Sequence, residues 1–97
     1  MDWPDGLIDD RDLYKRLTKH FGVDETDRRM HDRLLSMEFV VRRAYTTGRI
    51  KRFVGRKPDS GEVMGYAYRW TEVLSVLKAD ASTPPEMKLT LEAATPV

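Results

Sequence analysis

The fold of this chain depends on residues 48–70, which read GRIKRFVGRKPDSGEVMGYAYRW. The segment starts with a run of cations and ends with a run of aromatic residues, and a proline and a glycine lie between them. Residues 49–55 and 63–70 each alternate in side-chain type, which is the two-residue period of a strand. Pro58 fixes its own φ and Gly61 tolerates a positive φ, so a turn is expected between the two runs. The segment is therefore predicted to be a β-hairpin.

Alternation also assigns the two faces of the return strand. One face is expected to carry Met64, Tyr66, Tyr68 and Trp70, and the other Gly65 and Ala67. The small residues leave room for a close approach. The aromatic face is expected to pack on the helices of the domain, and stacking on unpaired bases is the alternative.

Two helical regions are expected before the hairpin, after an N-terminal arm of residues 1–8 whose Trp3 packs on the domain. The first helix is capped by Asp9 or Asp10 and ends at Gly22, a residue type that commonly follows a helix. Its apolar stripe consists of Leu13, Leu17 and Phe21. Four residues are predicted to be largely buried in the core, namely Leu17, Leu34, Val41 and Trp70.

The second helical region covers residues 25–46 and is opened by Asp24 or Thr26. Its apolar stripe recurs at spacings of three and four residues and consists of Met30, Leu34, Met37, Val41 and Ala44. One long helix fits this pattern, and two helices separated near Ser36–Met37 fit it equally well. Gly48 is expected to end the region in either case.

The C-terminal part of the chain is predicted to contain a short helix and a tail. Thr71 is expected to cap a helix of about eight residues. Residues 1–79 are thus expected to form one domain, followed by a linker and an extended tail over residues 80–97. In the tail, Met87, Leu89 and Leu91 alternate with polar residues. Residues 86–92 are therefore predicted to form an extra strand on the hairpin of the same chain or of a second copy, which would give a homodimer.

Positive charge is concentrated in one block of a chain whose net charge is only +1. Residues 39–57 contain seven Lys and Arg residues and no acid, whereas the segments before and after this block are each net negative. Such asymmetry indicates a polyanionic partner. A merely solvated charged face is the alternative, although the apolar residues inside the block predict that it is structured.

The order of these elements resembles excisionase-like and MerR-like winged-helix proteins. FGVDETDRRM, residues 21–30, looks like the turn of a helix-turn-helix, and three pairs stand where the wing and the following helix of that family would lie: Gly48-Arg49, Tyr68-Arg69 and Thr71-Glu72. The resemblance covers residues 10–78 and implies a small α+β winged-helix domain. It also implies a DNA-binding transcriptional regulator of the kind that phages and mobile elements encode.

The expected DNA-binding residues lie at the end of the second helical region and in the hairpin, because the start of that region is acidic and would repel phosphate. They are Arg42, Arg43, Thr46, Thr47, Arg49, Lys51, Arg52, Arg56 and Lys57. Arg and Lys neutralise phosphates, and Arg also reads guanine edges. The alternative function is a protein-interaction module that docks a partner through the apolar hairpin arm and the C-terminal strand.

Catalysis, cofactors and metal binding are not expected. The chain has no cysteine, and its two histidines are His20 and His31. Asp27 and His31 have helical spacing, but a third ligand is missing. No apolar run approaches the roughly 18 residues that a membrane span needs, and the acidic start does not resemble a signal peptide. We therefore expect a cytoplasmic protein with duplex DNA as its partner, no membrane association and no small-molecule substrate.

Overall fold

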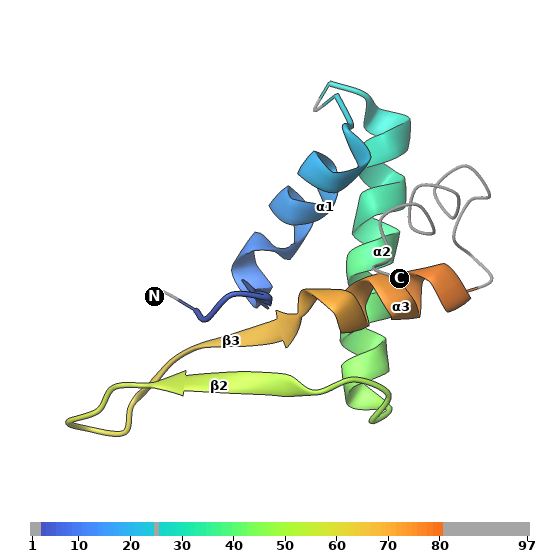
Figure 1. Cartoon of the computed structure of the whole chain (residues 1–97). Coiled ribbons are helices and arrows are strands. Elements are labelled where there is room, and N and C mark those ends of the chain that lie inside the picture. Colours follow the sequence, from blue (N-terminus) through green and yellow to red (C-terminus); the bar gives the residue numbers. More distant parts are fainter. Residues whose placement is uncertain (1–2, 25, 81–97) are drawn as a thin grey trace.

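The computed structural model describes residues 3–24 and 26–80 and shows an α+β domain (Figure 1). Its elements, in chain order, are β1 (Leu7–Asp9), the 3-10 turn η1 (Asp10–Asp12), α1 (Leu13–Phe21), α2 (Arg28–Thr46), β2 (Arg52–Arg56), β3 (Val63–Arg69) and α3 (Trp70–Ala79). Within the described ranges there are three α-helices and one small antiparallel sheet, so the predicted α+β class is confirmed.

The sheet has the strand order β1–β3–β2, with β3 in the centre. β1 pairs with the end of β3, so that Leu7 faces Arg69 and Ile8 faces Tyr68. Residues 1–8 were expected only to be an arm anchored by Trp3, and the pairing of Leu7 and Ile8 as a strand was not predicted. A strand of three residues is too short to show a period, and only the partner strand defines it. The strand predicted over residues 86–92 lies outside the described residues.

The predicted hairpin is confirmed, but β2 begins at Arg52 rather than Arg49. The reason is that the Arg49 N–H donates to the carbonyl of Ala44 at 2.8 Å, so the chain is still closing the end of α2 at this point. Gly61 has a φ of 71° in the turn, as its position predicted. The pairing of the two strands shifts between Gly55 and Arg56, where the hairpin continues toward its tip.

The first helix starts later than expected and ends where expected. The Asp9 side chain accepts from the Arg11 N–H and caps η1, and α1 itself begins only at Leu13. Gly22 ends α1 in the left-handed conformation, with a φ of 62°. Its N–H donates to the carbonyl of Lys19, which satisfies one of the free carbonyls of the last turn.

α2 is one continuous helix, and the structure thereby decides between the two alternatives left by its periodicity. Asp27 caps it by accepting from the N–H groups of Arg29 and Met30, so neither Asp24 nor Thr26 is the cap. At the suspected break, the Ser36 hydroxyl donates to the carbonyl of Asp32 one turn earlier without interrupting the helix. Burial of one stripe along its whole length stabilises the long helix.

α3 begins at Trp70, directly after β3, and the prediction that Thr71 caps it was wrong. Arg69 is the capping residue and makes no side-chain cap hydrogen bond. The Trp70 N–H donates to the carbonyl of Gly6 at 2.8 Å, so a contact with the segment before β1 satisfies this donor instead of a cap. The helix has ten residues, two more than expected.

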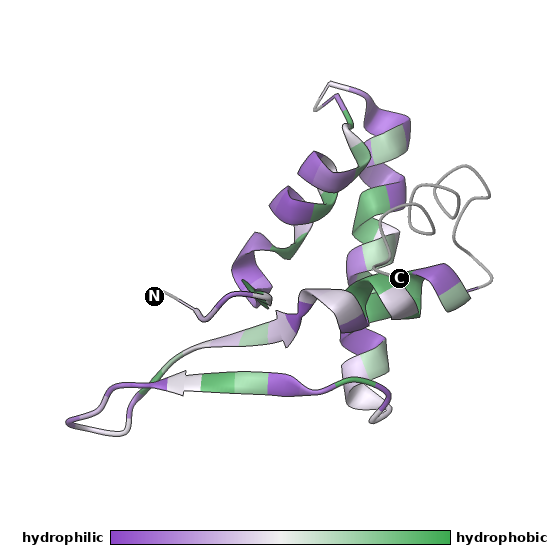
Figure 2. Cartoon of the chain, viewed as in Figure 1, coloured by the Kyte–Doolittle hydropathy of each residue, from purple (hydrophilic) through white to green (hydrophobic). Residues whose placement is uncertain are grey.

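The core lies where the three helices meet the sheet. The part of α3 that crosses α2 is hydrophobic (Figure 2). Leu17, Leu34 and Val41 are fully buried, as predicted. Trp70 is only half-buried, because it lies at the edge of the core with Arg16 over its ring at 5.1 Å. Ala67 is also fully buried, so the face opposite the aromatic residues is not open there.

Candidate nucleic-acid interface

The nine expected DNA-binding residues lie in one continuous region, from the last turns of α2 to the tip of the hairpin (Figure 1). Arg42, Arg43 and Thr46 belong to α2, Thr47 is its C-cap, Arg49 and Lys51 lie in the link to β2, Arg52 and Arg56 belong to β2, and Lys57 begins the turn. The region is at the opposite end of α2 from the α1–α2 connection. The contacts of these side chains divide them into two groups.

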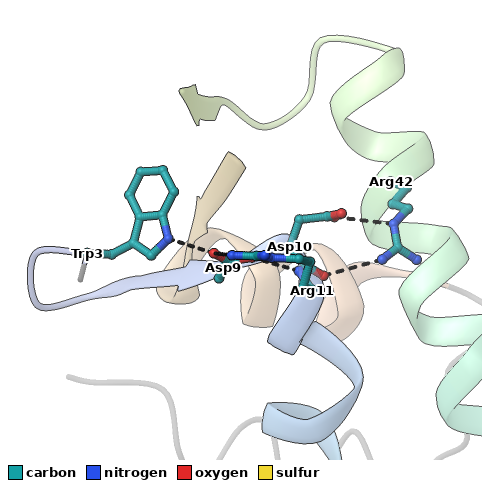
Figure 3. A network of polar contacts seen from close by, with 5 residues as sticks. All are labelled: Trp3, Asp9, Asp10, Arg11 and Arg42. Carbon is teal, nitrogen blue, oxygen red and sulfur yellow. Dashed lines mark hydrogen bonds and ion pairs between the residues drawn. The ribbon is translucent and has the colours of Figure 1, made fainter. Parts of the chain in front are cut away.

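Arg42 is held by contacts within the domain (Figure 3). Its Nε lies 3.3 Å from Asp10 Oδ1 and its Nη1 lies 3.5 Å from Glu38 Oε2. Burial alone would lower the pKa of Arg42, but the two carboxylates outweigh burial and raise it. The contact ties η1 to α2, and the charge of Arg42 is already compensated.

A second polar cluster holds the start of the chain on the sheet (Figure 3). Trp3 Nε1 donates to Asp9 Oδ2 at 2.9 Å, and the Arg11 guanidinium donates to both carboxylate oxygens at 3.2 and 3.3 Å. The hydrogen bond from Arg11 lowers the pKa of Asp9 to about 2, against the opposing effect of burial. The cluster lies over Gly65, where an added Cβ would be 3.6 Å from Asp9 Oδ2 and 3.9 Å from Trp3. Sequence analysis assigned Trp3 to packing and Asp9 to capping, but it did not predict the contact between them.

Arg52 lies between two aromatic rings. Its guanidinium carbon is 4.2 Å from the centre of the Tyr45 ring and 3.9 Å from that of Tyr66. Such cation–π contacts fix the guanidinium and connect β2 to both α2 and β3. Tyr68, next along this face, is buried, and burial with the nearby charge of Asp10 raises its pKa to about 12. These groups position the hairpin relative to α2.

The hairpin tip keeps part of its charge. Arg56 Nη1 donates to the carbonyl of Gly61 at 2.9 Å, which orders the side chain without neutralising it. Lys57 Nζ lies 3.3 Å from Glu62 Oε2, and both side chains are about half exposed or more. An ion pair this exposed is weak and can exchange for a phosphate.

Arg43, Arg49 and Lys51 form no ion pair with any other residue in ranges 3–24 and 26–80. All three are exposed. Arg43 and Arg49 line a groove beside α2, whose other lining residues are Ser36, Phe39, Val40, Ala44, Thr47 and Asp80. Because the C-terminal end of a helix carries partial negative charge, phosphate attraction here must come from side chains and not from backbone N–H groups.

The hydroxyls of Thr46 and Thr47 back-bond to α2. Thr46 Oγ1 donates to the carbonyl of Arg42 at 3.0 Å, and Thr47 Oγ1 donates to that of Arg43 at 3.0 Å. Each oxygen retains acceptor capacity, while its proton is engaged. In the absence of rearrangement, the two residues are therefore acceptors toward a ligand.

Several apolar residues of this region are exposed, including Met64, which was expected on the face that packs against the helices. Phe39 is 67% exposed and Leu35 is 44% exposed on α2, and Val54, Val63 and Met64 are 39–45% exposed on the hairpin. The position of Phe39 outside the apolar stripe of α2 was evident in the sequence, whereas Leu35 directly follows Leu34 and fits the edge of that stripe. Their position on the outer face becomes clear only because α2 is one helix.

The two histidines have local contacts. The Tyr14 hydroxyl and His31 Nδ1 form a hydrogen bond. His20 packs edge-on against Phe21 and Trp70. Burial, with a smaller contribution from Arg16, lowers the pKa of His20.

Over residues 3–24 and 26–80, no three His, Cys, Asp or Glu side chains are grouped as a metal ion requires. None of the helices in these ranges is sufficiently long and apolar for a membrane span.

Comparison of the chain with models of protein families, with curated proteins and with solved structures finds no match. The winged-helix resemblance therefore remains a hypothesis about fold family and function.

Proposed function

We propose that this protein is a winged-helix DNA-binding protein of the regulatory type. It binds duplex DNA with the C-terminal half of α2 and with the β2–β3 hairpin as the wing. The observation that carries this proposal is the group of exposed cations Arg43, Arg49 and Lys51 at the junction of α2 and β2, which have no ion-pair partner among the residues that the structure describes. The order helix, helix, hairpin, helix supports it.

The charge in this region is in excess of what the domain compensates. Arg42 has two carboxylate partners and Lys57 has one, whereas Arg56 donates only to a neutral carbonyl. Together with these three cations, Arg56 gives four exposed side chains with no carboxylate within ion-pair distance among the described residues. Arg52 has no such carboxylate either, but it is enclosed by the rings of Tyr45 and Tyr66. Phosphate binding releases counterions from DNA and is favoured by such a cluster.

The shape of the region also fits a duplex. An α-helix is about 10–12 Å across, and the major groove is about 12 Å wide. The hairpin extends from the C-terminal end of α2 to a tip that carries Arg56 and Lys57 (Figure 1). A wing of this kind can contact the backbone or the minor groove beside the site of the helix.

Salt dependence of binding tests the proposal. Binding of a random-sequence duplex should weaken with salt, with a slope of log K against log salt of roughly −3.6 if the four uncompensated cations each contact one phosphate. The triple variant R43A/R49A/K51A should retain the fold and reduce the magnitude of this slope by roughly 2.7. A wild-type slope near zero would end the proposal.

The matched control is the triple variant K19A/R28A/R29A, which removes the same charge. These residues lie around the α1–α2 connection, at the other end of α2. The control should keep the wild-type slope. An equal reduction in both triple variants would show that only net charge matters and that the α2–β2 junction is not the binding surface.

A second candidate function is docking of a protein partner on the hairpin. Exposure of Val54, Val63 and Met64 on adjacent strands favours it. An apolar contact of this kind depends little on salt, so the same titration separates the two functions.

A further inference from the structure

Phe39 is the most exposed large hydrophobic residue of the described chain, at 67%. Met37 and Val41, two residues to either side, are 3% and 0% exposed. At about 100° per residue, Phe39 is about 200° around the helix from both. Its ring therefore points away from the core, at the centre of the outer face of α2.

Phe39 has both apolar and charged neighbours in the groove that it lines, where Val40, Ala44 and Asp80 also lie. It lines the same groove as Arg43, one helical turn later, and as Arg49. Both of these cations lack an ion-pair partner among the described residues. A ligand of this face must therefore combine negative charge with an apolar group. Duplex DNA offers that combination in its major groove, where the C5-methyl group of thymine projects beside the phosphates.

We propose that Phe39 contacts a thymine methyl group in the major groove and so contributes base specificity, while Arg43 beside it contacts the same site through phosphate or a base edge. This inference rests on the proposed DNA-binding function. A phenyl ring neither donates nor accepts conventional hydrogen bonds, so its discrimination between bases depends on apolar contact. Removal of the methyl group should then weaken DNA binding only when the Phe39 ring is present.

Deoxyuridine substitution tests the contact, because it removes the methyl group and leaves the Watson–Crick face unchanged. A preferred site is first enriched from a duplex library with a random core, using the wild-type protein. Each thymine of that site is then replaced in turn by deoxyuridine. We expect one or two replacements to weaken wild-type binding about fourfold, which corresponds to about 0.8 kcal/mol for one buried methyl group.

F39A should bind the thymine site about fourfold more weakly than wild type, and it should bind the thymine and deoxyuridine sites equally. The substitution introduces a better helix former at an exposed position, so the fold should persist, as a thermal melt will confirm. V54A is the control, because it truncates another exposed apolar residue on the hairpin. It should retain the preference for thymine.

Three results would overturn the inference. The first is an equal deoxyuridine effect, or none, in wild type and F39A. The second is a preference of the wild type for single-stranded over duplex DNA that F39A loses, which would indicate stacking on an unpaired base. The third is a wild-type dimer in sedimentation that F39A converts to a monomer with unchanged DNA affinity. In each case a salt-dependent duplex affinity would leave the proposed function standing, whereas its absence would remove both.

Discussion

Replacing Asp9 by Asn should destabilise the domain at neutral pH by releasing the cluster that holds the start of the chain on the sheet. Asp9 is 6% exposed and accepts hydrogen bonds from Trp3 and Arg11. Asn keeps the shape of the side chain, but it has no charge and replaces one acceptor oxygen by a donor. β1 has only three residues and depends on such contacts to stay paired with β3.

The size of the effect follows from the pKa of Asp9, which is lowered from 3.8 to about 2. This difference corresponds to at most about 2.5 kcal/mol of stability at pH 7. Arg11 is 71% exposed, so solvent screening reduces the contribution to about 1–2 kcal/mol. Because the folded-state pKa of Asp9 is the lower one, this stability is complete above pH 4 and is lost as the pH falls toward 2.

Urea unfolding followed by circular dichroism at several pH values between 7 and 2 measures the effect. The difference in unfolding free energy between wild type and D9N should be about 1–2 kcal/mol at pH 7 and should shrink below pH 4. D5N is the control, since Asp5 is exposed and lies just before the same strand. A wild-type–D9N difference that is near zero at pH 7, or constant down to pH 2, would refute the role given to the cluster.

Three further perturbations follow from burial and contacts. L34A removes a fully buried side chain and should lower the free energy of unfolding in urea by about 2–5 kcal/mol. L35A changes the next residue, which is 44% exposed, and should lower it by less than about 1 kcal/mol. Equal effects would mean that the buried stripe of α2 is misassigned. R52A should lower stability by about 1–2 kcal/mol because two ring contacts are lost, and a thermal melt without DNA detects this loss. An unchanged melting temperature would mean that the ring contacts of Arg52 do not stabilise the domain. Because burial lowers the pKa of His20, stability from its neutral form should be full above pH 6.5 and fall as the pH drops through the folded-state pKa. H20F should remove that part of the pH dependence, and an identical profile in both proteins would contradict it.

Local patterns in the sequence determined most of the secondary structure. The apolar stripes of α1 and α2, Gly22 at the end of α1 and the turn at Gly61 involve residues close in the chain, so their physics is visible in a short window. Local patterns did not predict β1, because a three-residue strand has no period of its own and forms only on the edge of β3. Local patterns also gave the wrong cap for α3, because a contact with Gly6 replaces the expected cap at Thr71.

The candidate site was likewise only partly contained in the sequence. The concentration of positive charge between residues 39 and 57 was evident from composition and order alone. Which of these cations remain available was decided by tertiary structure. Asp10, far away in the chain, compensates Arg42, and Tyr45 and Tyr66 enclose Arg52, whereas no carboxylate of the described residues reaches Arg43. The physical reason is that charge compensation acts over a few ångströms of space, and the neighbours at that distance are set by how helices and strands pack.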